Sequence, residues 1–586
     1  MDRVLSVLEG KLGLEGLTEP RDRALVRIGF AIALIAAVLR IVFWLYTQRY
    51  WEDALITCLH SENMASGFGM THVRPGEPPL HGFTSPLSVL APLIGDLIHV
   101  GWGMDFLKLV SLPASFLMVF YVLALGIHPS VRFPAPLAVL AMGYVAVEHQ
   151  QILWGMAGME TQLSAAILMA SVYYVVAWRP VALGVTLGLC MLVRPDYAFW
   201  TLIVGIYTVF REPRSILKVA GIALAVYLPW ILFTTLYYGS PLPNTIVAKG
   251  LGYASWWDKA PVVDFAAVKR HVWMTMAEHL HILLSPIFAG HGSGQHIFFF
   301  EGPESPLANL MFFFAVVGTL AILFKRQWTL WPLAALVVTY SLYYVFLVPI
   351  IFGWYKVPYI ATLLLLSVRG LQTCTAWIAW ERVRTGIQAG VAVCYLSLFM
   401  GVLPLTFQTE RQIQVHVENA VRKEAGLYLR EHMKADEAVG CEPLGYMAYY
   451  SRGNVYDWPG LASRTVVAWS KAHPEERCLE GMLKGLQPEY LFLRDMELLF
   501  WFKDPQWFKD RYHVVKVFGV DPAVRPTIRW IDRNIDTRFR ILKKNRPEDV
   551  LPYDASLWPT QLPDHEAQSP PLSSIASSES PAAPRG

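Results

Sequence analysis

Apolar segments alternate with short polar connections through the first 406 residues of the chain. They lie at 24–46, 106–127, 133–150, 158–178, 180–194, 197–210, 216–235, 306–324, 329–352, 357–373 and 388–406. A transmembrane helix needs roughly 20 apolar residues, so the pattern predicts a polytopic α-helical membrane protein with about eleven spans. We interpret 180–194 and 197–210 as two tilted spans, and the shorter apolar stretch 86–100 as an interfacial or re-entrant helix.

The polar positions gather after the last predicted span. Of the 95 Asp, Glu, Lys and Arg residues, 44 lie between Glu410 and Asp549. We therefore divide the chain into a transmembrane domain (1–406), a soluble domain (407–550) for which we expect an α/β fold, and a tail (551–586). The tail is rich in Pro, Ser and Ala and is predicted to be disordered.

Composition supports the membrane assignment, because 54% of the residues are hydrophobic and only 16% are charged, against roughly 25% in soluble domains. The net charge of +3 gives no indication of nucleic-acid binding. The first apolar segment follows about 23 polar residues and lacks a small-residue cleavage site, so it is not a cleavable signal peptide.

The distribution of arginine and lysine predicts the orientation. With the N-terminus in the cytoplasm, the cytoplasmic connections carry most of the basic residues near the spans. These are Arg132, Arg179, Arg211, Arg214, Lys325, Arg326, Arg382 and Arg384. Eleven spans then place the C-terminal domain and two long loops, at about 47–105 and 236–305, outside the membrane.

Several common active-site motifs are absent from the sequence. There is no GxSxG, P-loop, GxGxxG or HExxH motif and no CxxC pair, so no soluble cofactor and no metal site is predicted. A metal requirement is left open. An extracytoplasmic location permits a disulfide between Cys441 and Cys478, but their proximity cannot be deduced.

The first outer loop begins with two adjacent acids, Glu52 and Asp53. A carboxylate here could accept a proton from a sugar hydroxyl as a general base. The alternative is an interfacial acidic pair that ends a span, and position alone does not separate the two. The loop closes on His81-Gly82-Phe83-Thr84-Ser85, where glycine and proline shape turns.

Two further motifs lie at the outer ends of predicted spans. In Arg194-Pro195-Asp196 the guanidinium suits a phosphate, but Arg194 could equally pair with Asp196. Glu160 could bind a hydroxyl or a cation in a cavity. Chemistry alone favours a simpler role for it, as a carboxylate at a helix N-terminus.

The second outer loop opens with Asn244 and Lys249. The amide of Asn244 could bind sugar hydroxyls and the ammonium of Lys249 a phosphate, although spacing alone favours a helix cap and a solvated lysine. Tyr355 and Lys356 lie between two later spans, where an interface belt is the more common role. A lipid-phosphate contact is the sharper alternative for Lys356.

Five motifs together resemble a bacterial family of the GT-C class of integral-membrane glycosyltransferases. The family includes the terminal arabinofuranosyltransferases of actinobacterial arabinan. The motifs, in order, are Glu52-Asp53-Ala54-Leu55-Ile56, His81-Gly82-Phe83-Thr84-Ser85, Gly158-Met159-Glu160-Thr161, Arg194-Pro195-Asp196 and Tyr238-Gly239-Ser240-Pro241-Leu242-Pro243-Asn244-Thr245. The resemblance covers roughly residues 24–520. The family usually has Asp-Asp where this chain has Glu52-Asp53.

The resemblance implies a transferase in the bacterial cytoplasmic membrane that moves a sugar from a polyprenyl-phosphate donor to a glycan or lipid acceptor on the outer face. It implies that Asp53 is the catalytic base, with Glu52 beside it. Arg194, Lys249, Lys356 and Tyr355 are then the candidate donor-phosphate ligands, and Glu160, Asp196, Asn244, His81 and Thr84 the candidate substrate ligands. The rival hypotheses are a lipid-linked sugar transporter and a non-catalytic envelope protein that binds glycan.

Overall fold

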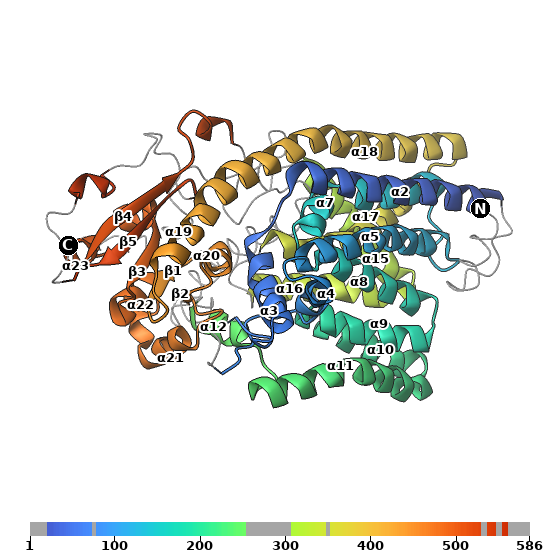
Figure 1. Ribbon diagram of the computed structural model, residues 1–586. Helices are drawn as coiled ribbons and strands as arrows, with labels where there is room; N and C mark the ends of the chain where they lie inside the picture. The colour runs from blue at the N-terminus through green and yellow to red at the C-terminus, as the bar shows by residue number, and fades with distance from the viewer. Residues whose placement is uncertain are drawn as a thin grey trace, which may run out of the picture.

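The computed structural model describes residues 20–72, 78–252, 306–346, 352–528, 536–546 and 554–560. A bundle of helices forms one end of the molecule and a mixed α/β domain the other (Figure 1). Most of the predicted second outer loop, from 253 to 305, lies outside the described residues, as does the predicted tail except for 554–560.

Helices cover the predicted apolar segments, and three further helices lie in the predicted outer loops. They are α2 (Pro20–Thr47), α3 (Glu52–Ala65), α4 (Leu87–Ile98), α5 (Gly103–Ile127), α6 (Ala135–Val147), α7 (His149–Met156), α8 (Thr161–Val176), α9 (Pro180–Val193), α10 (Ala198–Arg211), α11 (Ile216–Tyr238), α12 (Asn244–Gly252), α15 (Pro306–Phe324), α16 (Trp331–Phe346), α17 (Gly353–Thr375) and α18 (Glu381–Gln412). The three in the predicted outer loops are α3, α4 and α12.

Several of these helices are long and apolar enough to cross a bilayer. Within the described residues there are five, or six when α7 and α8, which meet at 117°, are counted as one broken span. The apolar helices α4, α6 and α9 are shorter. The prediction of a multi-pass helical membrane protein is confirmed, whereas the count of eleven spans and the orientation stay predictions.

Polar groups and prolines explain where the apolar segments break. The predicted segment 133–150 divides into α6 and α7 at Glu148, whose carboxylate accepts hydrogen bonds from the backbone amides of Gln150 and Gln151. The connection between α9 and α10 contains Pro195, which favours a break because it lacks an amide hydrogen for the helical hydrogen bond. Helix α4 has 12 residues, about 18 Å at 1.5 Å per residue, and is therefore too short to span a bilayer alone.

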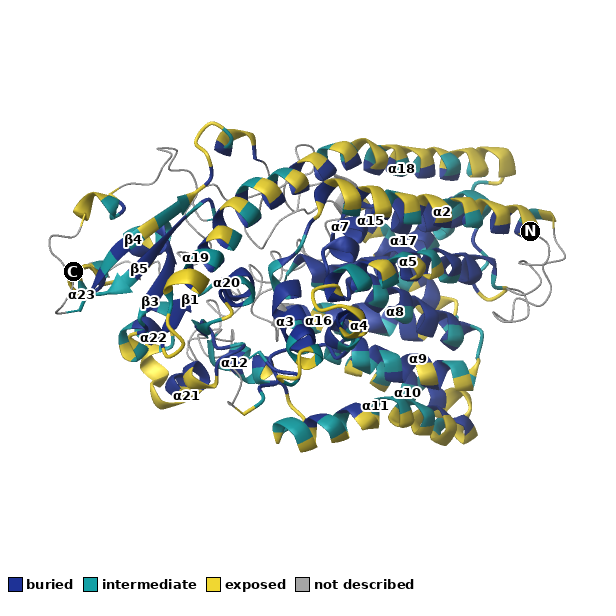
Figure 2. Cartoon of the chain, in the orientation of Figure 1, coloured by how far each residue is buried: buried dark blue, intermediate teal, exposed yellow. Residues whose placement is uncertain are grey.

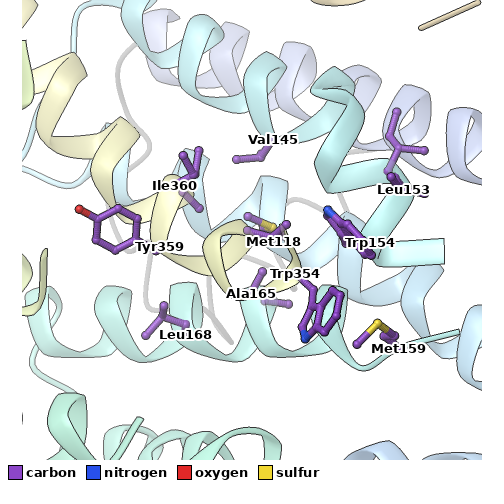
Figure 3. Packing of buried hydrophobic residues seen from close by; sticks show 14 of the residues in the cluster. Met118, Val145, Leu153, Trp154, Met159, Ala165, Leu168, Trp354, Tyr359 and Ile360 are labelled. Atoms are coloured by element: carbon purple, nitrogen blue, oxygen red, sulfur yellow. The ribbon is translucent and has the colours of Figure 1, made fainter. Parts of the chain in front are cut away.

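Burial divides the bundle into inner and outer helices. Figure 2 shows α7 and α8 largely buried, while α11 and α18 expose much of their surface. The exposed side chains of α11 include Leu217 and Leu236, 82% and 86% exposed, as expected of a lipid-facing helix. In the centre, the rings of Trp154 and Trp354 lie 5.2 Å apart, close to Met159 (Figure 3).

The C-terminal domain is α/β, as predicted. Its five strands are β1 (Ala438–Cys441), β2 (Asn454–Asp457), β3 (Tyr490–Arg494), β4 (Tyr512–Gly519) and β5 (Arg538–Lys544). They form one sheet in the order β2-β1-β3-β5-β4, in which β1 is parallel to β2 and β3, and β5 is antiparallel to β3 and β4. The helices of the domain are α19 (Glu424–His432), α20 (Leu444–Ser451), α21 (Arg464–Ala472), α22 (Leu479–Leu486) and α23 (Pro505–Arg511).

One helical stretch joins the two domains. Helix α18 continues through a π-helical segment, Ile413–Lys423, into α19. The boundary that we placed at 406 thus falls inside a helix rather than in a linker. At the junction, α20 packs on α3 and α21 packs on α12, so the soluble domain rests directly on both outer loops (Figure 1).

Candidate active site

A cavity of about 610 Å³ opens at the junction of the two domains. Its walls come from α3, the end of the first outer loop, the α9–α10 connection, α12, α16 and the start of α17. Its polar lining residues are Asp53, Thr57, Thr84, Ser85, Ser88, Glu160, Arg194, Asp196, Thr245, Lys249, Tyr343, Tyr344 and Tyr355. The cavity therefore brings together residues from the predicted motifs that are far apart in the sequence.

Asp53 presents its carboxylate to this cavity from the first turn of α3. Burial raises the pKa of Asp53 above the ordinary carboxyl value, while the ammonium group of Lys249 opposes the shift. Within the described residues, no side chain or backbone group donates a hydrogen bond to this carboxylate. Asp53 thus has an available carboxylate of raised basicity, the property that a general base requires.

Arg194 is held by a set of partners on one side of its guanidinium group. Its Nε donates to Asp196 Oδ1 at 3.0 Å and its Nη2 to Asp196 Oδ2 at 3.1 Å. Tyr340 and Tyr344 both donate to the same Oδ2 oxygen, and Arg194 stacks over the ring of Tyr355 at 4.8 Å. In the described part of the chain, the Nη1 group has no hydrogen-bond partner and remains available to an anion.

Lys249 supplies a second cation to the cavity from α12. Its Nζ donates to the hydroxyl of Tyr355 at 3.3 Å. Burial alone would lower the pKa of Lys249, but the Tyr355 hydroxyl and the Asp53 carboxylate raise it overall. Lys249 therefore carries a positive charge, and it interacts with both Tyr355 and the candidate base, Asp53.

Glu160 and Thr84 also line the cavity. Glu160 directly precedes α8 and makes no side-chain capping hydrogen bond. Its place at a helix N-terminus agrees with the simpler role, and its place in the cavity wall with the binding role, so both interpretations stay open. The carboxylates of Asp53, Glu160 and Asp196 outnumber the two cations, Arg194 and Lys249. An anion in this cavity would therefore need both cations to act together.

The structure separates Glu52 from Asp53. The Oε2 oxygen of Glu52 lies 3.3 Å from Nη1 of Arg422, and its Oε1 accepts a hydrogen bond from the backbone amide of Gly445 at 3.2 Å. Burial raises the pKa of Glu52 to about 8 against the opposing charge of Arg422. Glu52 contacts the soluble domain and does not line the cavity, so the structure does not support a catalytic role for it.

His81 and Asn244, two candidate substrate ligands, lie beside the cavity and not in its wall. The ring of His81 is buried and stacks on Tyr238 at 4.7 Å. The amide of Asn244 donates to the carbonyl oxygens of Gly460 and Leu461. Both residues hold loops together, and Asn244 links the second outer loop to the soluble domain.

Lys356 is the remaining candidate that the structure does not bring to the cavity. It is fully buried in α17. Trp354 and Tyr355 line the cavity, and the next residue of a helix points about 100° further around the axis. Lys356 therefore lies inside the bundle, where Glu148 is an electrostatic partner, and its contact with the donor phosphate stays a prediction that the cavity lining does not support.

Sequence reasoning missed the tyrosines of α16 and one residue of the soluble domain. Tyr340 and Tyr344 are four residues apart and share one helix face, a spacing that could have indicated a common partner. Leu461 is the cavity-lining residue from the soluble domain, and no local pattern indicated it.

The two cysteines that a disulfide could have joined do not pair in this structure. Cys441 is buried and Cys478 is exposed, and both are free thiols.

Comparison with known proteins gives a family match for one part of the chain. Residues 408–541 match a domain of unknown function (DUF8728). This region covers the C-terminal α/β domain and the helical segment that leads into it. No curated protein matches the sequence.

Solved structures give a match over most of the chain. ArnT from Cupriavidus metallidurans in the apo state has a TM-score of 0.50 and 12% identity, covering 87% of this chain and 97% of that chain. The archaeal oligosaccharyltransferase AglB from Archaeoglobus fulgidus has a TM-score of 0.48 and 14% identity, covering 84% and 74%. ArnT bound to undecaprenyl phosphate has a TM-score of 0.45 and 13% identity, covering 88% and 98%.

The likeness to apo ArnT shows the fold. The chain shares the overall fold of that protein, which in this chain is a bundle of helices followed by a C-terminal α/β domain.

Proposed function

We propose that the protein is a glycosyltransferase that moves a sugar from a polyprenyl-phosphate donor to a glycan or lipid acceptor. The observation that carries the proposal is the composition of the cavity. A carboxylate, Asp53, and two cations, Arg194 and Lys249, line one cavity between the apolar helices and the soluble domain. A lipid-linked substrate with an anionic leaving group needs these features together.

Each residue has a distinct task in the proposed reaction. An acceptor hydroxyl attacks the anomeric carbon of the donor sugar, and its proton passes to the carboxylate of Asp53. The bond between the anomeric carbon and the phosphate oxygen breaks, and polyprenyl phosphate leaves with the electron pair. The Nη1 group of Arg194 and the ammonium of Lys249 stabilise the charge of the leaving phosphate, which is most effective where water is largely excluded.

The proposal extends to the direction from which each substrate arrives. The polyprenyl chain reaches the cavity from the lipid around the helical bundle, and the acceptor arrives from the side of the soluble domain. We place this domain outside the cytoplasmic membrane, with the N-terminus inside, on the distribution of basic residues. Arabinofuranose is the first donor sugar to test, because the sequence motifs resemble arabinofuranosyltransferases.

The test is a transfer assay with purified protein and a panel of polyprenyl-phosphate sugars, comparing wild type with Asp53→Asn. Asp105→Asn is the matched control, because Asp105 is a half-buried carboxylate near α3 that bonds Tyr50 and does not line the cavity. Sugar transfer from one donor that is lost in Asp53→Asn and kept in Asp105→Asn would support a glycosyltransferase with Asp53 as its base. If folded wild-type protein binds a donor but transfers no sugar, the result favours a non-catalytic binding protein. If it moves an intact donor across the membrane of a vesicle, the result favours a transporter.

A further inference from the structure

Two neighbouring carboxylates in the first turn of α3 point in different directions, one into the cavity and one toward the soluble domain. Asp53 lines the cavity, whereas Glu52 contacts Arg422 and Gly445 of the C-terminal part of the chain. Successive residues of a helix are about 100° apart. The contacts with Arg422 and Gly445 hold Glu52 away from the cavity, and a fixed direction for Glu52 also fixes the direction of Asp53.

Arg422 connects Glu52 to a buried ionic network. Its guanidinium lies 3.2 Å from Glu418 and 2.8 Å from Asp536, and its side chain is only 4% exposed. Asp536 is shared in turn with Arg494 at 3.2 Å. Glu52 is thus attached to a buried ionic network rather than to a solvated side chain.

Gly445 allows the close approach of the two domains at this point. A Cβ atom at position 445 would lie 2.6 Å from Cγ of Glu52 and would also contact the Glu52 backbone. Any side chain here would push α20 away from the start of α3. Gly445 and Arg422 together hold Glu52 in place: Gly445 packs closely against it and donates its backbone amide, and Arg422 forms the ion pair.

We infer that Glu52 is a positioning residue, which holds the first turn of α3 against the soluble domain and so sets the place of the Asp53 carboxylate in the cavity. The inference rests on the proposed function of Asp53. A reacting group displaced by about 1 Å can cost a hundredfold in rate. The soluble domain is then part of the catalytic machinery, because it determines where the base lies.

The test compares Glu52→Ala with Glu52→Gln in the full-length protein. Alanine removes both contacts, whereas glutamine keeps one acceptor oxygen and so retains one of the two contacts, with either the Gly445 amide or Arg422. We expect Glu52→Ala to lower kcat by about 100-fold with the donor KM unchanged, and Glu52→Gln to stay within about fivefold of wild type. An equal loss in both variants would overturn positioning in favour of proton transfer by Glu52 itself, and full activity of Glu52→Ala would overturn it altogether.

A second measurement does not depend on activity. Hydrogen exchange of the peptide that contains residues 50–56 should rise in Glu52→Ala and in Arg422→Ala, and the double variant should resemble either single one. Arg540→Ala is the matched control, because Arg540 makes a buried ion pair with Asp495 at 2.7 Å within the same domain. Unchanged exchange at 50–56 in both Glu52→Ala and Arg422→Ala would overturn the inference, as would an equal rise in Arg540→Ala.

These outcomes are separable from failure of the proposed function. If no donor supports transfer, or if Asp53→Asn retains it, the proposed function fails whatever Glu52 does. If wild type transfers sugar and Asp53→Asn does not, the Glu52 variants test positioning alone.

Discussion

The side-chain amide of Asn244 donates hydrogen bonds to the carbonyl oxygens of Gly460 and Leu461, at 2.8 and 3.0 Å. The backbone amide of Asn244 also donates to the carbonyl of His81 at 2.9 Å. One residue thus joins the first outer loop, the second outer loop and the soluble domain. This junction keeps Leu461 at the wall of the cavity.

Replacing Asn244 by alanine should loosen this junction. Two hydrogen bonds are lost, at about 1 kcal/mol each, so we expect about 2 kcal/mol less stability for the docked soluble domain. Thermal unfolding and limited proteolysis of the detergent-solubilised protein measure the effect. Asn63→Ala is the control, because Asn63 makes one comparable bond, to Thr71 at 2.8 Å, within the first outer loop; equal proteolysis of the two variants would contradict the prediction.

Lys249 should control the pH dependence of transfer. Burial raises the pKa of Asp53 and Lys249 lowers it, so removing the cation in Lys249→Met must raise this pKa further. Because the base acts only when deprotonated, the acid limb of the pH profile of kcat should move to higher pH. Lys249→Arg retains the charge and should leave the limb near its wild-type position. If the acid limb does not move in Lys249→Met, the limb does not report the ionisation of Asp53.

Tyr344 should contribute to phosphate binding through Arg194. Its hydroxyl accepts from Nη2 of Arg194 at 3.3 Å and donates to Asp196 at 2.9 Å, so Tyr344→Phe removes support on both sides of the ion pair. Bonds to charged groups contribute about 1.5–3 kcal/mol, and we expect binding of polyprenyl phosphate to weaken roughly tenfold or more. Tyr359→Phe is the control, since Tyr359 pairs with Ser341. Equal losses in the two variants would show a general effect of tyrosine hydroxyls in the bundle.

Local sequence was sufficient to predict those site residues whose position follows from a helix end. Arg194 precedes a proline, which favours a helix end at that position, and Glu160 precedes the first residue of α8. Both therefore lie at helix termini, where the cavity is. The alternation of long apolar and short polar segments likewise predicted a multi-pass helical domain. The same pattern could not decide which short helices cross the membrane, because it contains no information on tilt or bending.

Other residues needed the three-dimensional structure. Helix phase decides that Tyr355 faces the cavity and Lys356 the bundle, and a phase error of one residue exchanges them. Glu52 and Asp53 are chemically equivalent in the sequence, and only the contact with Arg422, 370 residues away, separates their roles. Asn244 and Leu461 are 217 positions apart. Contacts at such distances leave no periodic signal in a single sequence.

Leu461 should influence which acceptor is used. It lines the cavity from the soluble domain, and its loop is fixed by the buried carboxylate of Asp457, which accepts hydrogen bonds from the amides of Gly460, Leu461 and Ala462. Replacing Leu461 by alanine widens the cavity on the acceptor side, and replacing it by tryptophan narrows it. A change of one or a few methylene groups in an apolar pocket alters discrimination by about 1–3 kcal/mol.

We therefore expect the two Leu461 variants to change the acceptor KM in opposite directions for a bulky acceptor, with the donor KM unchanged. Steady-state transfer assays with acceptors of graded size measure this effect. Leu486→Ala is the control, because Leu486 packs against a buried apolar cluster of the soluble domain that includes Leu483 and Leu491, and it does not line the cavity. If the Leu461 variants change the donor KM instead, the donor rather than the acceptor occupies this side of the cavity, and the proposed directions of entry must be reversed.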